Sequence, residues 1–147
     1  MKKVLIIDTS ILCVWLNIPG MDICGPDHDQ WNKQRVQQKI TEEQQNNSTF
    51  VLPLATIIET GNHISQASHS RKERADALAD LMRKSADQQT PWAAFSEQST
   101  LWTSEKLKKL ADSWPKLAAT KLSIGDVTIK GYRFKPGQFF LKVCTLF

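Results

Sequence analysis

The hydrophobic pattern predicts two buried strands, each followed by a helix. Residues 4–7 (VLII) are branched apolar side chains with no polar position among them, which is typical of a parallel strand covered on both faces. Apolar residues then recur at helical spacing over residues 11–16, where Thr9 or Ser10 could cap the helix. Residues 50–52 repeat the strand pattern and residues 54–64 the helical one. This alternation indicates an α/β fold.

The helix expected at residues 54–64 has two unlike faces. One face is expected to be the buried stripe, made of Leu54, Ile57, Ile58, Gly61 and Ile64. The opposite side carries Thr56, Glu59, Thr60 and His63. On this pattern Glu59 lies beside the edge of the core.

Further helices and a last strand complete the predicted elements. The helical segments are a polar helix over residues 31–45 with an apolar stripe at Trp31, Val36 and Ile40, a helix over 70–86 with Ala77, Leu78, Leu81 and Met82 inward, a helix capped by Ser104 that restarts at Pro115, and a helix start at Ser123 to Asp126. Residues 138–147 have the pattern of a strand, and residues 91–102 fit no element clearly. With no repeat or interdomain linker, residues 1–147 are expected to form a single domain.

Composition and cysteine usage narrow the class of protein. The chain is 41% hydrophobic and 23% charged, which is ordinary for a globular domain. Three cysteines with no CxxC pair predict reduced thiols in a cytoplasmic protein. Asp8 interrupts the apolar N-terminus, which argues against a signal peptide, and no apolar run approaches the roughly 18 residues of a membrane span. No membrane partner is therefore expected.

The net charge of +4 is concentrated near the C-terminus. Residues 121–147 contain five Lys or Arg and one acid, whereas the rest of the chain is balanced. A basic patch attracts phosphate backbones without reading their sequence. A solvated lysine-rich surface is the ordinary interpretation of the same pattern.

Three acids that are far apart along the chain are the candidate catalytic residues. Asp8 directly follows the first strand, where an unpaired buried carboxylate would be costly, and parallel sheets bind ligands at this edge. Glu59 and Asp126 could converge on Asp8. Two such charges ~4 Å apart repel by about 4 kcal/mol at an effective dielectric of ~20, so a cluster favours a divalent cation, and oxygen ligands favour Mg²⁺ or Mn²⁺ over zinc. Singly, each acid has a structural alternative: Asp8 and Asp126 as helix caps, Glu59 as an ordinary exposed helix residue.

The motifs VLIIDTSIL, VLPLATIIETGNHI and LSIGDVTI resemble the PIN-domain nucleases. In that family one acid closes the first strand, a glutamate lies in the helix after the second strand, and a later acid opens a helix, and Asp8, Glu59 and Asp126 match these positions. The resemblance implies a three-layer α/β/α fold with a short, mainly parallel sheet surrounded by helices. It also implies a catalytic Mg²⁺ or Mn²⁺ held by the three acids and cleavage of RNA, often as the toxin of a toxin-antitoxin pair with an antitoxin protein as partner.

Other residues are assigned supporting roles at such a site. Thr9 or Ser10 would orient water or phosphate, and His63, Lys130 and Arg133 would contact the RNA. For His63 the alternative is an ordinary surface residue. Cys24 and His28, with acids nearby, are more simply explained as an incidental loop cluster than as a metal site.

The C-terminal segment departs from the family. Residues 131–147 are atypical, because KVCTLF offers no fourth acid. The alternative function is therefore a catalytically weak or inactive module of the same fold that binds RNA or a protein partner. An apolar last strand also leaves an edge with which a second copy could pair, giving a homodimer. A phosphoacceptor regulatory domain is a third alternative, but the first strand lacks the acid pair it needs.

Overall fold

The computed structural model describes residues 3–93, 103–125, 127 and 139–142, the last four by their backbone alone. In chain order the elements are β1 (Lys3–Ile6), α1 (Thr9–Trp15), β2 (Ile23–Cys24), β3 (Trp31–Asn32), α2 (Lys33–Gln45), β4 (Thr49–Val51), α3 (Leu54–Gln66), α4 (Arg71–Ala86), α5 (Ser104–Ala118) and β5 (Phe139–Lys142). No helix within these ranges is long and apolar enough to cross a membrane.

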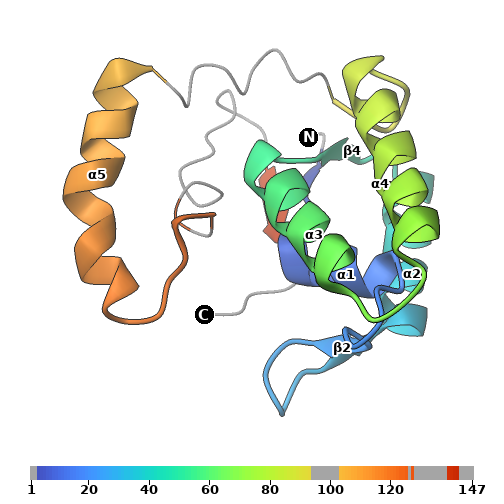
Figure 1. Ribbon diagram of the computed structural model, residues 1–147. Helices are drawn as coiled ribbons and strands as arrows, with labels where there is room; N and C mark the ends of the chain where they lie inside the picture. The colour runs from blue at the N-terminus through green and yellow to red at the C-terminus, as the bar shows by residue number, and fades with distance from the viewer. Residues whose placement is uncertain (1–2, 94–102, 126, 128–138, 143–147) are drawn as a thin grey trace.

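The central sheet is parallel, with strand order β4-β1-β5. In Figure 1 the sheet lies largely behind α3. Leu5 of β1 pairs with Phe50 of β4, and Ile6 pairs with Lys142 of β5. The expected α/β fold with a small parallel sheet is confirmed. Of the strand predicted at residues 138–147, residues 139–142 form β5, and residues 138 and 143–147 lie outside the described part.

A further segment extends the sheet beyond β4. The Phe50 N–H donates to the Pro91 carbonyl at 2.7 Å, and the Ala93 N–H donates to the Phe50 carbonyl at 2.8 Å. These bonds leave Trp92 as a parallel bridge partner of Phe50, with the two rings edge to face at 5.5 Å between centroids. Residues 91–93, for which the sequence predicts no element, are therefore anchored to the outer side of β4.

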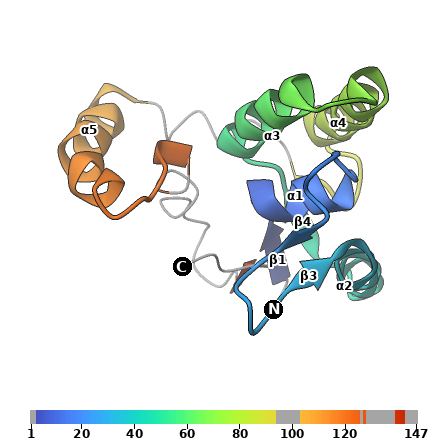
Figure 2. The ribbon, with the colours of Figure 1, turned by 60° about the horizontal axis from the view of Figure 1, so that its bottom comes forward.

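The main apolar cluster lies on the Leu5 and Ile7 side of the sheet. Buried residues of α1, α2, α3 and α4 all contribute to it. Figure 2 shows α1 between α2 and α3, with α4 beside α3. On the other face, Val4, Ile6 and Val51 are buried together, and Ala55 and Ala93 are the partly buried residues packed against them in the described ranges. The full three-layer arrangement stays a prediction.

Helix α3 is rotated relative to the predicted buried stripe. Ile57 and Ile64 are buried as expected, but Ile58 is 54% and Leu54 38% exposed, and Thr56 and Thr60 are fully buried instead. The cause is a tertiary hydrogen bond, in which Thr56 Oγ1 donates to the Ile7 carbonyl at 2.9 Å. This bond satisfies a backbone carbonyl just beyond β1, so threonine can occupy the core-facing position.

The inward face of α4 also differs from the prediction. Leu78 and Leu81 are buried, but Ala77 is half-buried and Met82 is 39% exposed. Ser85 is buried in their place, and its hydroxyl donates to the Ala93 carbonyl at 3.2 Å. As in α3, a hydroxyl that finds a backbone acceptor replaces an expected apolar contact.

Helix α5 runs without a break through Pro115, so the predicted restart there is wrong. The Thr103 side chain, rather than Ser104, caps it by accepting from the Lys106 N–H at 3.4 Å. None of its side chains is buried, and Figure 1 shows it apart from the helices around the sheet. The Trp114 indole donates to the Leu122 carbonyl at 3.1 Å, which ties the segment after α5 back onto it.

Glu43 is a fully buried carboxylate on α2 that the sequence pattern did not single out. It forms ion pairs with Lys39 at 2.9 Å and with Lys3 at 3.1 Å, and it accepts from the Ser48 hydroxyl. Burial alone would raise its pKa, but the hydrogen bonds from Ser48, Lys39 and Lys3 lower the pKa to about 2. The cluster joins the first strand, α2 and the start of β4.

Candidate active site

Asp8 lies at the corner of the fold where β1 ends and α1 begins. It is only 5% exposed, and its Oδ1 accepts from the Ile11 backbone N–H at 3.0 Å. It is therefore the N-cap of α1, and the expected cap at Thr9 or Ser10 is replaced by Asp8. A carboxylate at this position is stabilised by unpaired N–H groups and the helix dipole, which explains how a buried acid can follow an apolar strand.

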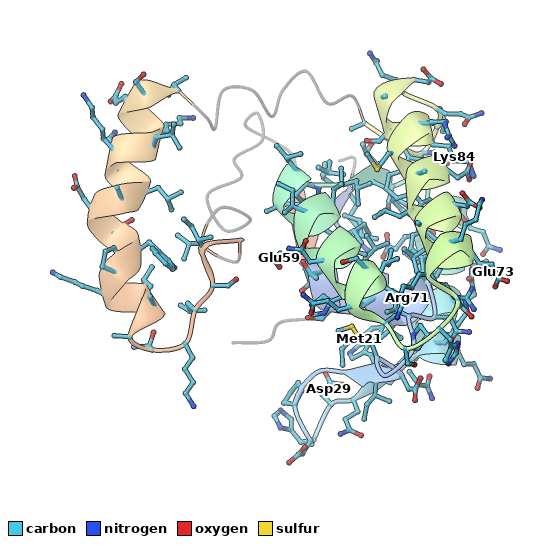
Figure 3. The ribbon with its side chains drawn as sticks, viewed as in Figure 1. Met21, Asp29, Glu59, Arg71, Glu73 and Lys84 are labelled. Carbon is cyan, nitrogen blue, oxygen red and sulfur yellow. The ribbon has the colours of Figure 1, made fainter. Side chains whose placement is uncertain are left out.

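Thr9 connects this corner to Glu59. The Thr9 hydroxyl donates to Glu59 Oε2 at 2.8 Å, joining the first turn of α1 to the middle of α3. Glu59 is half-buried, and Figure 3 shows it on the side of α3 away from α4. Because a threonine hydroxyl has one proton, Thr9 can accept from a bound water but has no proton left to donate to a phosphate.

The chain next to the third predicted acid also reaches Glu59. A helical turn starts at Ile124, and the Val127 N–H donates to the Ser123 carbonyl at 3.2 Å, in agreement with the predicted helix start. Gly125 in this turn is buried and lies against the Glu59 carboxylate, since a Cβ at that position would be 1.7 Å from Oε1. Asp126 itself lies outside the described residues.

A buried cysteine, Cys13 of α1, lies near Thr60, Asp8 and Glu59. Burial is the main cause that raises the pKa of the Cys13 thiol to about 11, the Thr60 hydroxyl acts in the opposite direction, and the charges of Asp8 and Glu59 add to the rise. The thiol therefore stays protonated near neutral pH. It can act neither as a nucleophile nor as a soft metal ligand without a large cost.

The other predicted site residues are placed as follows. Ser10 is half-buried in the first turn of α1, and His63 is exposed one turn after Glu59 on α3. Lys130 and Arg133 lie outside the described residues. Within the described ranges, no group of three or more His, Cys, Asp or Glu side chains is arranged to hold a metal. The residues around Cys24 and His28 are therefore not such a group.

The donor chemistry at this corner fits a hard divalent cation. Carboxylates and hydroxyls are the ligands that Mg²⁺ and Mn²⁺ prefer, and the nearby Cys13 stays a protonated thiol, which does not favour a softer ion. The Glu59 carboxylate occupies the space that a side chain at position 125 would need. Asp8 and Glu59 could hold such an ion, with Asp126 as the third predicted ligand.

Sequence reasoning missed two features of this corner. The pattern predicts that Thr9 or Ser10 orients water or phosphate, but it gives no sign that the Thr9 proton is donated to Glu59. Gly125 was not singled out, although it immediately precedes a candidate acid. A glycine at that position was the available signal, because glycine is common where a backbone approaches another group closely.

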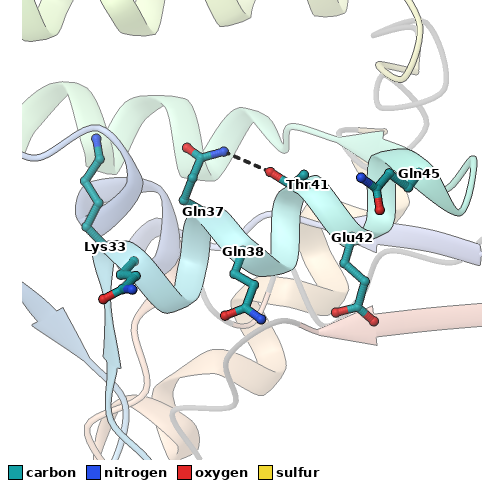
Figure 4. Close-up of a pocket in the computed structure, with 7 residues that line it drawn as sticks. Lys33, Gln37, Gln38, Thr41, Glu42 and Gln45 are labelled. Carbon is teal, nitrogen blue, oxygen red and sulfur yellow. Dashed lines mark hydrogen bonds between the residues drawn. The ribbon is translucent and has the colours of Figure 1, made fainter.

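Two surface hollows in the described part of the chain are lined by residues other than Asp8, Thr9 and Glu59. One of about 1030 Å³ runs along the exposed side of α2 and is lined only by polar side chains of that helix, where Gln37 donates to Thr41 at 3.3 Å (Figure 4). The other, of about 410 Å³, lies between α3 and α4 and includes Gly61, Ala79 and Met82. Neither contains a cluster of catalytic groups.

Comparison with protein-family models, with curated proteins and with solved structures gave no match. The PIN-domain resemblance thus remains a prediction from the three sequence motifs. The functional conclusion depends on the residues of this chain alone.

Proposed function

We propose that this chain is a metal-dependent endoribonuclease of PIN-domain type, which hydrolyses RNA phosphodiesters with Mg²⁺ or Mn²⁺ held by Asp8, Glu59 and Asp126. The observation that supports this most is a meeting of three distant segments. Thr9, next to Asp8, donates to Glu59, and Gly125, next to Asp126, lies against the same carboxylate. The sheet edge where Asp8 lies is also where parallel α/β sheets bind ligands.

Each residue would have a distinct role. A cation bound here would lower the pKa of a coordinated water and stabilise the leaving oxygen of the phosphodiester. Asp8 and Glu59 would hold the cation, and Thr9 would orient Glu59. Ser10, in the same turn as Thr9, is the hydroxyl we assign to the RNA phosphate, and His63, exposed on α3, would lie along the path of the RNA strand.

The proposed partners follow from the same resemblance. RNA is the substrate, with Lys130 and Arg133 supplying positive charge to its backbone. A toxin role would add an antitoxin protein in the cytoplasm as a partner, and a homodimer is the alternative assembly. These assignments depend on the nuclease proposal.

The proposal is tested by cleavage of a mixed-sequence single-stranded RNA with Mn²⁺, with Mg²⁺ and with EDTA. Asp8→Asn is the informative variant, because asparagine caps a helix about as well as aspartate while removing the charge. We expect cleavage by the wild type with either metal, none with EDTA, and a loss of at least a hundredfold in Asp8→Asn. Wild-type cleavage retained by folded Asp8→Asn would contradict the proposal.

A binding module of the same fold is the second candidate. It is favoured by exposed apolar side chains: Leu54 and Ile58 on α3, and Met82, which lines the α3–α4 hollow. RNA binding in a filter or gel-shift assay that persists in EDTA and in Asp8→Asn, together with no cleavage by the wild type, would favour this candidate over the nuclease.

A further inference from the structure

The absence of a side chain at Gly125 allows the Glu59 carboxylate to lie where it does. A Cβ at Gly125 would be 1.7 Å from Glu59 Oε1, 2.7 Å from Cδ and 3.3 Å from Oε2. The first two distances are shorter than any non-bonded carbon contact, so even alanine would displace the carboxylate. Gly125 is buried, which leaves its backbone little room to retreat.

Backbone conformation does not explain why this residue is glycine. Among the described glycines, a positive φ occurs at Gly20 and Gly25, not at Gly125. Any L-residue could therefore adopt the backbone at position 125, and alanine would be the better helix former in this turn. The close approach of Glu59 remains as the reason.

The carboxylate is also held from the opposite side. Thr9 Oγ1 donates to Oε2 at 2.8 Å, while Oε1 faces Gly125. Glu59 is thus confined between the start of α1 and the turn at residues 123–127 before any ligand arrives. A carboxylate held in this way can bind an ion without first losing rotamer freedom.

We propose that Gly125 is a positioning residue: its missing side chain leaves the space in which Thr9 and the turn before Asp126 hold the Glu59 carboxylate, where it would serve as a ligand of Mg²⁺ or Mn²⁺. The identity of the ion rests on the proposed function. Mg²⁺ demands near-ideal octahedral geometry and Mn²⁺ also takes octahedral oxygen sites, whereas Ca²⁺ accepts flexible, irregular ligand sets. Displacing Glu59 should therefore weaken Mn²⁺ binding more than Ca²⁺ binding.

The direct test compares Gly125→Ala with Gly61→Ala. Gly61 lies on α3 close to Glu59 in sequence, but a Cβ there would meet nothing within 4 Å, so it controls for the substitution itself. By isothermal titration calorimetry, Gly125→Ala should raise the Mn²⁺ dissociation constant at least tenfold, as supporting residues around metal ligands do, with a smaller change for Ca²⁺. Gly61→Ala should leave both constants unchanged. A wild-type Mn²⁺ constant in folded Gly125→Ala would overturn the inference.

A metal-free measurement keeps this inference separate from the nuclease proposal. The side-chain carboxyl ¹³C resonance of Glu59 should shift in Gly125→Ala and not in Gly61→Ala, whether or not the wild type binds Mn²⁺. Absence of Mn²⁺ binding by the wild type would count against the nuclease, whereas an unmoved Glu59 resonance would count against the role of Gly125.

A double-mutant cycle covers the case in which Gly125→Ala does not fold. The clash is with Glu59, so adding Glu59→Ala should restore folding and raise the thermal midpoint of Gly125→Ala. In the Glu59→Ala background, alanine at 125 should be neutral or stabilising. A double variant as unstable as Gly125→Ala alone would overturn the inference.

Discussion

The lowered pKa of the buried Glu43 carboxylate allows a quantitative prediction of the free energy of unfolding. Its pKa is lowered from an ordinary 4.5 to about 2 by hydrogen bonds from Ser48, Lys39 and Lys3, which outweigh the opposing effect of burial. Each pKa unit corresponds to about 1.36 kcal/mol, so the ionised carboxylate stabilises the folded chain by about 3 kcal/mol. Glu43→Gln should remove about that much from the free energy of unfolding at pH 7.

The pH dependence has a defined sign. Because the pKa is lower in the folded than in the unfolded chain, the stabilisation is fully present above pH 4.5 and is lost as the pH falls from 4.5 towards 2. The difference in unfolding free energy between the wild type and Glu43→Gln should therefore be constant from pH 7 to about 5 and shrink at lower pH. Taking this difference cancels the contributions of the other carboxyl groups.

Urea denaturation followed by circular dichroism measures this difference at a series of pH values. Glu42→Gln is the matched control, since Glu42 is the neighbouring residue on α2, its side chain is 56% exposed and, among the described residues, its ion pair is with Lys39, at 3.6 Å. The control should change the unfolding free energy by less than about 1 kcal/mol. Equal stability of Glu43→Gln and the wild type at pH 7, or a difference that persists unchanged to pH 3, would refute the reasoning.

Two further predictions concern the core. Ile57→Ala should cost about 2 to 5 kcal/mol of unfolding free energy and Ile58→Ala less than about 0.5, because Ile57 is 9% and Ile58 54% exposed; equal losses would contradict the orientation of α3. The raised pKa of Cys13, about 11, predicts slow alkylation by iodoacetamide at pH 8 until the chain is unfolded, whereas the partly exposed Cys24 should react sooner. Peptide mass spectrometry would distinguish the two cysteines, and equally fast reaction of both in the folded chain would argue against the burial of Cys13.

Local patterns predicted β1, β4 and most of the helices, but not β2, β3 or residues 91–93, and they did not predict which faces the helices bury. The runs at residues 4–7 and 50–52 predicted β1 and β4 because buried parallel strands are continuously apolar. The orientation of α3 depended instead on the hydrogen bond from Thr56 to the Ile7 carbonyl, 49 residues away in sequence. A hydropathy pattern gives no indication of such a bond and therefore assigned Ile58 to the core.

At the candidate site, too, the position of one acid could be predicted from the sequence, but the tertiary contacts around it could not. The position of Asp8 after a buried strand could be predicted, because an acid there is unusual and the sheet edge is a common ligand site. The bond from Thr9 to Glu59 and the approach of Gly125 are tertiary contacts between segments far apart along the chain. Likewise, the burial of Glu43 required Lys3, 40 residues away, which no spacing rule connects to it.

The central claim is that Asp8, Glu59 and Asp126 hold one cation together. Anomalous diffraction from crystals soaked in Mn²⁺, recorded above and below the manganese absorption edge, tests this claim most directly. We predict a single anomalous peak at the end of β1, with carboxylate oxygens of all three acids within about 2.0 to 2.6 Å, the range for such hard cations. No peak at this corner, or a separation of more than about 10 Å between the Asp126 oxygens and those of Asp8 and Glu59, which is too far for a shared ion or a pair of ions about 4 Å apart, would contradict it.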